Sequence, residues 1–182
     1  MKRRTALQLI VIGAAAPLEA QHAGHAPAAA AAEAAAELRF LSAAQNALVD
    51  RLAEMILPAD DHSPGAHDAQ VSAFIDELLA DSAAKEQQAW TAGLEAVEAA
   101  AKERFGKPFL ECTDAEQDKI LAEMAASEEN PNNALQRFFA KIKMQTISGY
   151  YTSRIGLLGE LEYKGIVPIP EYEACKHPEH GE

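Results

Sequence analysis

Residues 134–148 read ALQRFFAKIKMQTIS, a stretch in which apolar residues return at the spacing of a helix. This spacing puts the large apolar side chains on one side and leaves charged residues on the other. The apolar side carries Leu135, Phe138, Phe139 and Ile142. The break Asn130-Pro131-Asn132-Asn133 comes directly before the stretch and is typical of a turn. We therefore predict a helix over residues 134–148 that packs one side into a core.

The same pattern predicts four helices upstream. Ser42 is expected to cap a helix over about 43–57, Asp68 to cap a second, and Thr113 with Glu116 to form a capping box for the fourth. The third is predicted over about 82–104, where Gly106 and Pro108 stop it. Their inward residues are predicted to be Leu48, Leu52, Met55, Ile56, Val71, Phe74, Ile75, Leu78, Leu79, Trp90, Leu94, Val97, Ile120, Leu121 and Met124.

The fold class follows from these helices. A short helical piece is predicted near residues 155–162, and three prolines after Gly165 indicate an extended tail. No useful length of sequence alternates apolar and polar residues as a strand does. The sequence therefore predicts an all-α protein: a small irregular helical bundle with an extended C-terminal tail.

Composition and charge disfavour two classes of partner. The chain has 182 residues, is 48% hydrophobic and 24% charged, and carries a formal net charge of -12 from 16 Lys and Arg against 28 Asp and Glu. Such a length and composition indicate one soluble domain. The charge disfavours nucleic acid and anionic membrane surfaces, because both require clustered Lys and Arg.

The first residues have the pattern of an export signal. Lys2, Arg3 and Arg4 precede an apolar stretch over residues 6–16, which is too short to span a bilayer as a helix. The paired arginines resemble the twin-arginine pattern that exports folded proteins; the alternative is an ordinary secretion signal that contains two arginines. We expect a signal over residues 1–20, a flexible alanine-rich tether over 21–37, and one helical domain with its tail over 38–182.

Two cysteines are present, Cys112 and Cys175. In a reducing cytosol they would be buried thiols, but two cysteines in an oxidising compartment usually pair. Because the leader indicates export, we predict a disulfide that ties the C-terminal tail to the segment before the fourth helix.

Signatures of catalysis are mostly absent. There is no phosphate-binding glycine loop, nucleophile elbow, H-E-x-x-H or C-x-x-C motif. The densest titratable cluster consists of Asp60, Asp61, His62, His67 and Asp68. One alternative is that this cluster binds a divalent metal. The other is that it forms a polar turn in which an aspartate side chain accepts hydrogen bonds from backbone amides. Further histidine pairs lie in the end segments, at His22, His25, His177 and His180. We predict no catalytic, cofactor or metal site in this chain.

Adjacent tyrosines mark a candidate interface. Tyr150 and Tyr151 cannot both face inward from one element, so one is expected in the core while the other offers its ring and hydroxyl to a partner.

Three parts of the chain resemble the gluconate 2-dehydrogenase subunit 3 family. The first covers ILPAD, PGA and VSAFID within residues 56–76, and the second covers WTAGL and FGKPF within residues 90–109. The most specific is GYYTSRIG over residues 149–156, with LEY at 161–163 and Cys175 after a proline-containing tail. The leader fits too, since many members begin with a twin-arginine signal.

This resemblance implies a non-catalytic subunit in the bacterial periplasm. The partner would be a large dehydrogenase subunit similar to the glucose–methanol–choline flavoproteins, which carries FAD and the substrate site. A multihaem cytochrome c often takes the electrons onward as a third subunit. The small subunit would aid folding, stability and twin-arginine export of the large one. The expected partner interface is Tyr150, Tyr151, Thr152, Arg154 and Ile155.

Two other functions are open at this point. A free-standing periplasmic metal-binding protein would use the Asp60–Asp68 loop and the histidine pairs. A small enzyme would need a carboxylate site that matches no familiar motif.

Overall fold

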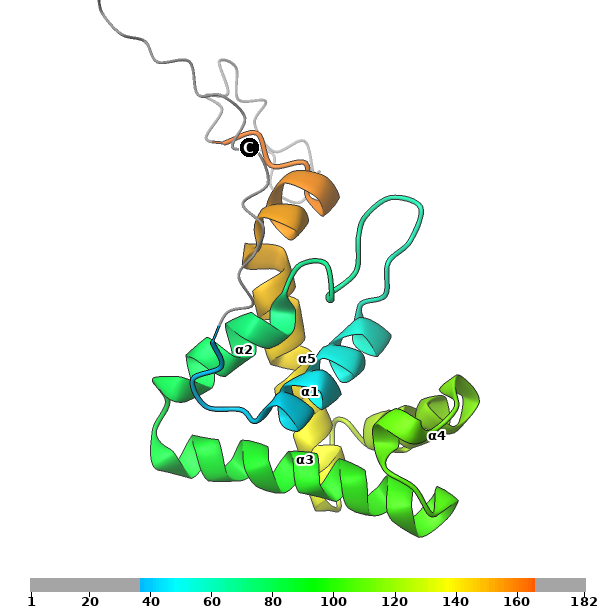
Figure 1. Cartoon of the computed structure of the whole chain (residues 1–182). Coiled ribbons are helices and arrows are strands. Elements are labelled where there is room, and N and C mark those ends of the chain that lie inside the picture. Colours follow the sequence, from blue (N-terminus) through cyan, green and yellow to red (C-terminus); the bar gives the residue numbers. More distant parts are fainter. Residues whose placement is uncertain (1–36, 166–182) are drawn as a thin grey trace, which may run out of the picture. The chain divides into compact units, whose positions relative to one another are not determined.

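The computed structural model describes residues 37–165, and these contain helices and turns but no strand. The helices are α1 (Ala43–Ile56), α2 (Val71–Ala80), α3 (Ala84–Phe105), α4 (Asp114–Ala125) and α5 (Ala134–Thr152), with the short turns η1 (Phe109–Glu111) and η2 (Gly156–Glu160) (Figure 1). The predicted all-α class is thus confirmed. Arg3, Arg4 and Cys175 lie outside the described residues. No helix within residues 37–165 has the length and apolar character needed to cross a lipid bilayer.

Helix α5 lies against every other α-helix of the described chain and against η2 (Figure 1). Its predicted apolar side is buried, and Phe138 meets Trp90 of α3 edge to face with ring centroids 5.3 Å apart. Trp90 is 1% exposed, so its prediction as a core residue is confirmed. A Cβ at Gly93 would lie 2.1 Å from the Phe138 ring, so α3 approaches α5 this closely only because position 93 is glycine.

The predicted starts of α1 and α4 are confirmed. Ser42 and Gln45 form a capping box: the Gln45 N–H donates to Ser42 Oγ, and the Ser42 N–H donates to Gln45 Oε1 at 3.0 Å. At α4 the Thr113 N–H donates to Glu116 Oε2 at 2.7 Å. Lys107 also binds this carboxylate, and together these contacts lower the pKa of Glu116 to about 2.

The start of α2 differs from its prediction. The helix begins at Val71 rather than after Asp68, and Gln70 before it has a left-handed backbone with φ 54° and no side-chain cap. The turn before it is closed by backbone bonds instead, including Val71 N–H to the Ala66 carbonyl. Asp68 is therefore a turn residue.

The buried side of α2 contains other residues than predicted. Val71, Ile75 and Leu79 are fully buried at four-residue spacing, while Phe74 and Leu78 are each 37% exposed at its edge. The prediction that the latter two point fully inward is wrong: Ser72 and Asp76 are buried beside the apolar row instead, and Phe74 packs at the edge against Gly149 of α5. At the other end of the chain, α5 runs past the predicted residue 148 to Thr152, and the piece predicted near 155–162 is the single π-helical turn η2.

One buried carboxylate ties the start of the domain to α2. Asp76 is 3% exposed and accepts the backbone N–H groups of Arg39 at 2.6 Å, Phe40 at 3.0 Å and Leu41 at 2.6 Å. Burial alone would raise the pKa of Asp76, but these three bonds and the charge of Arg39 together lower it below its ordinary value. The ionised carboxylate therefore stabilises the folded chain.

We expect Asp76→Asn to lower the free energy of unfolding by about 1–3 kcal/mol at neutral pH, because one acceptor oxygen becomes a donor. A group whose pKa falls on folding stabilises above its unfolded pKa and loses that effect as pH falls through the folded pKa. The difference from the wild type, measured by urea unfolding, should therefore shrink below about pH 4. Asp118→Asn on the exposed side of α4 is the control. An equal change in both variants, or no pH dependence, would contradict the assignment.

Candidate functional site

Three segments meet at the hydroxyl of Tyr150. This residue is 3% exposed, and its hydroxyl oxygen lies 2.8 Å from the Pro64 carbonyl oxygen and 3.0 Å from Ser63 Oγ. Ser63 Oγ in turn donates to Glu160 Oε2 of η2 at 2.9 Å. We call Tyr150, Ser63, Pro64 and Glu160 the Tyr150 junction. It holds the loop over residues 57–70 and the turn η2 against the end of α5.

Tyr150 is a core residue, which corrects its prediction as part of a partner interface. It follows Ile142 and Thr146 at four-residue spacing, and both of these are fully buried, so the same side of α5 carries all three. Tyr151 is one position further round the helix and is half-buried. The two rings meet edge to face, with centroids 5.2 Å apart. Tyr151 packs partly against the core, and of the two tyrosines it is the one that keeps part of its side chain exposed.

The chain turns sharply after Tyr151. Ser153 ends α5: its hydroxyl donates to the Tyr150 carbonyl at 2.6 Å and accepts the Gly156 N–H at 3.0 Å. A Cβ at Gly156 would lie 2.1 Å from the Tyr150 carbonyl oxygen, so only glycine allows η2 to fold back against the helix. This glycine belongs to the most specific part of the resemblance, and its role there is steric.

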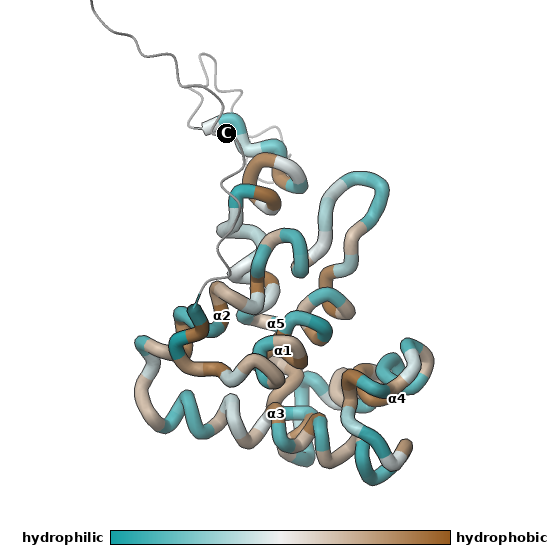
Figure 2. The backbone as a smooth tube through the Cα atoms, viewed as in Figure 1, coloured by the Kyte–Doolittle hydropathy of each residue, from teal (hydrophilic) through white to brown (hydrophobic). Residues whose placement is uncertain are grey.

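The segment over residues 151–163, here the C-terminal segment, presents apolar side chains to solvent. Leu158, Leu161 and Tyr163 are 52%, 55% and 51% exposed. Figure 2 shows hydrophobic residues in the turn η2. Among the predicted interface residues, Thr152 and Arg154 are exposed, while Ile155 packs partly against the core. Sequence reasoning missed the exposed leucines, although large apolar residues among charged ones are a usable signal.

The outer side of α5 continues this apolar surface. Met144 and Ile147 are 61% and 37% exposed, and Tyr151 follows them at the spacing that keeps all three on one side of the helix. That side is opposite the buried row that contains Ile142. Scattered apolar residues on a surface are ordinary, but a row along one helix side is typical of an interface.

The polar loop over residues 57–70 is organised by hydrogen bonds from its backbone amides to side-chain carboxylates. Asp60 Oδ1 accepts the N–H groups of Ser63 and His62, each at 2.8 Å, and these bonds lower the pKa of Asp60. No group of three or more His, Cys, Asp or Glu residues in the part of the chain described here could hold a metal ion. Asp60, Asp61, His62, His67 and Asp68 therefore form a polar turn; the four end-segment histidines lie outside the described residues.

A His–Asp–Ser group in this region does not have the geometry of a catalytic triad. His67 Nδ1 lies 2.7 Å from Asp50 Oδ2, and Ser72 Oγ donates to Asp50 Oδ1 at 3.2 Å. In a triad the histidine stands between the carboxylate and the nucleophile. Here the carboxylate stands between the other two, so His67 cannot take a proton from Ser72. The contact with Asp50 raises the pKa of His67 and ties the loop to α1.

Cys112 is buried directly before α4. Its thiol donates to the Pro108 carbonyl at 3.4 Å, and burial raises its pKa. A buried thiol with a raised pKa is a poor nucleophile. Cys175 lies outside the described residues, so the disulfide stays a prediction.

We expect Tyr150→Phe to lower the free energy of unfolding by about 1 kcal/mol, because the Pro64 carbonyl and Ser63 lose a buried partner. Backbone amides of the 57–70 loop should also exchange with solvent faster. Urea unfolding and hydrogen exchange measure the two effects. Tyr151→Phe is the matched control on the half-exposed neighbour. If both variants behave alike, the hydroxyl of Tyr150 does not hold the loop.

Comparison with known proteins identifies a family for this chain. Residues 43–168 match the family described as gluconate 2-dehydrogenase subunit 3. No curated protein and no solved structure matches the chain. The matched region runs from the start of α1 past η2 and covers more than half of the sequence. It includes the Tyr150 junction and the C-terminal segment. The chain therefore belongs to the gluconate 2-dehydrogenase subunit 3 family.

Proposed function

We propose that this protein is the non-catalytic small subunit of a periplasmic dehydrogenase complex, and that it binds a large FAD-containing subunit through its C-terminal segment. The family match over residues 43–168 carries the proposal, because the family is named as one subunit of a multi-subunit dehydrogenase. The surface row that ends in Tyr151 supports a role in binding.

The docking surface in this proposal consists of the outer side of α5 and the C-terminal segment. Met144, Ile147, Leu158 and Leu161 provide exposed apolar area, and Arg154 is exposed among them in sequence. Aromatic residues, Met and Arg are the types enriched in protein interfaces. The Tyr150 junction holds η2 before the partner arrives, so little conformational freedom would be lost on binding.

FAD belongs to the large subunit in this proposal, and a haem group to a possible cytochrome c subunit. Dinucleotide cofactors are held at the glycine-rich turn between a strand and a helix. Residues 37–165 form helices alone, which supports placing the flavin in the partner. The substrate site would lie with the flavin in a subunit similar to the glucose–methanol–choline flavoproteins.

Export of the complex would depend on this chain. Arg3 and Arg4 precede the apolar stretch over residues 6–16 in the twin-arginine pattern. This route carries folded proteins, and a flavoprotein must fold around FAD before it leaves the cytoplasm. A signal on the small subunit would therefore carry the loaded large subunit with it.

Co-purification tests the proposal. A tagged chain isolated from the periplasm should bring with it a larger yellow protein with flavin absorbance. Tyr151→Ala combined with Leu158→Ser should reduce the bound flavoprotein about tenfold or more, because aromatic hot spots contribute about 1–4 kcal/mol. Leu78→Ser on α2, another exposed leucine, should leave the yield unchanged.

Two outcomes would contradict the proposal in different parts. Isolation of the wild type as a monomer, with dehydrogenase activity unchanged when its gene is deleted, would exclude the complex.

Arg3→Lys with Arg4→Lys should keep both proteins in the cytoplasm. If the flavoprotein still reaches the periplasm, the complex stands but the signal serves this chain alone.

A further inference from the structure

A hollow lies between the start of α1, the middle of α3 and η1, away from the C-terminal segment. Its volume is about 500 Å³, within the range of pockets that bind ligands. Leu48 and Leu94, each 2% exposed, form its apolar floor, and Leu110 on η1 is 43% exposed at its edge. An open apolar hollow of this size exposes surface that a partner would bury.

Carboxylates surround this apolar floor. Glu95 and Glu98 project from α3, and Glu111 from η1. None of the three forms an ion pair with a Lys or Arg among residues 37–165, and Glu98 instead accepts the Phe109 N–H at 3.1 Å.

Two lysines lie beside one end of this hollow, where Lys102 and Lys107 line the next space together with Glu98. Lys107 binds Glu116 at 2.8 Å, and Lys102 is exposed one turn beyond Glu98. The hollow is therefore apolar at its base and negatively charged at its rim.

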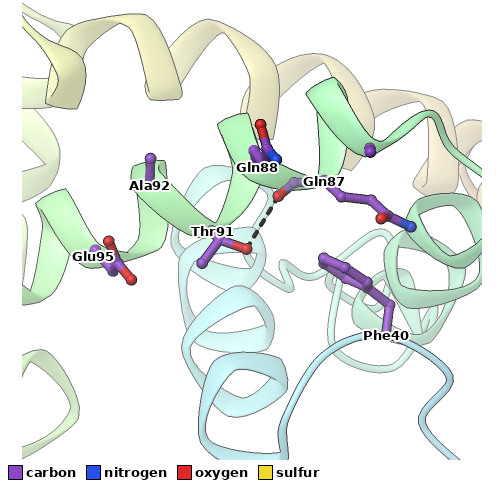
Figure 3. Close-up of a pocket in the computed structure, with 7 residues that line it drawn as sticks. Phe40, Gln87, Gln88, Thr91, Ala92 and Glu95 are labelled. Atoms are coloured by element: carbon purple, nitrogen blue, oxygen red, sulfur yellow. Dashed lines mark hydrogen bonds between the residues drawn. The ribbon is translucent and has the colours of Figure 1, made fainter.

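The hollow continues along α3 in both directions. Towards the start of the helix a space of about 320 Å³ shares Glu95 with it, and Figure 3 shows the Phe40 ring beneath Gln87 and Thr91 there. Towards the end a space of about 400 Å³ shares Glu98 and Pro108 but is also lined by Lys102 and Lys107, so the acidic rim ends there. We call the first two hollows together the α3 groove. The α3 residues that line this groove run from Ala84 to Glu98, a distance of about 21 Å along the helix that fits a peptide segment better than a small molecule.

We propose that the α3 groove binds a segment of a partner protein in which an apolar side chain is flanked by Lys or Arg. The apolar side chain would fill the hollow between Leu48, Leu94 and Leu110. The flanking cations would pair with Glu95 and Glu98 on α3 and with the η1 carboxylate at its edge. Charge complementarity of this kind selects a partner and speeds its association.

The charge of the chain argues against a second copy in the groove. Each copy carries a formal net charge of -12, so pairing two copies across this acidic rim would bring like charges together. The inference also stands apart from the proposed function, because the groove and the C-terminal segment use different elements. Either surface can fail its test while the other passes.

Photo-crosslinking of the full chain in its native host tests the groove, because a covalent adduct captures the occupant directly. The photoreactive residue p-benzoylphenylalanine replaces Leu110, and in a second strain it replaces Leu158. We expect an adduct at position 110 whose sequenced peptide has an apolar residue next to Lys or Arg. The triple variant Glu95→Gln, Glu98→Gln and Glu111→Gln should lower that adduct about tenfold and leave the adduct at position 158 unchanged.

A matched triple variant separates the rim from the overall charge. Glu77→Gln, Asp118→Asn and Glu129→Gln remove the same number of charges from other exposed positions and should not change the adduct at position 110. Circular dichroism confirms that both triples fold. The proposal is overturned by an adduct with a second copy, by a crosslinked peptide without basic residues, by equal loss in both triples, or by the absence of a protein adduct at position 110.

Discussion

The hydroxyl of Tyr150 needs a hydrogen-bond partner inside the protein, because the ring that carries it is 3% exposed. Its acceptors come from the 57–70 loop, and Ser63 in that loop donates to Glu160 of η2. This chain of hydrogen bonds links a long loop and the turn η2 to α5, while Glu54 and Asp50 hold the same loop to α1. Gly156 completes the arrangement, since any side chain there would meet the Tyr150 carbonyl. Because this junction holds the turn, it also fixes the positions of Leu158 in η2 and Leu161 directly after it.

Local signals in the sequence are sufficient for part of this fold. The Ser42 and Thr113 caps depend on contacts within four residues, so both helix starts can be predicted. Trp90 shares its helical spacing with its buried neighbours, and that spacing alone places it in the core. The start of α2 cannot be predicted from Asp68, because backbone hydrogen bonds close the turn before Val71. No pattern of side chains in the sequence indicates such bonds.

The candidate site needs tertiary information. The spacing shows that Tyr150 and Tyr151 differ in direction, but only the extension of α5 to Thr152 shows which one is buried. The exposure of Leu158 and Leu161 depends on how η2 folds back on Ser153 and Gly156. The α3 groove also escapes a sequence pattern, since Leu48, Glu95 and Leu110 come from three separate elements. Apolar floor and acidic rim become neighbours only after packing.

In the proposed function, the C-terminal segment is the surface that binds the flavoprotein. Hydrogen exchange of the isolated chain and of the purified complex tests that assignment most directly. We predict at least tenfold slower exchange in the complex for amides of residues 150–163, with α4 unchanged. Equal exchange of residues 150–163 in the two samples, with slowing confined to other helices, would contradict it.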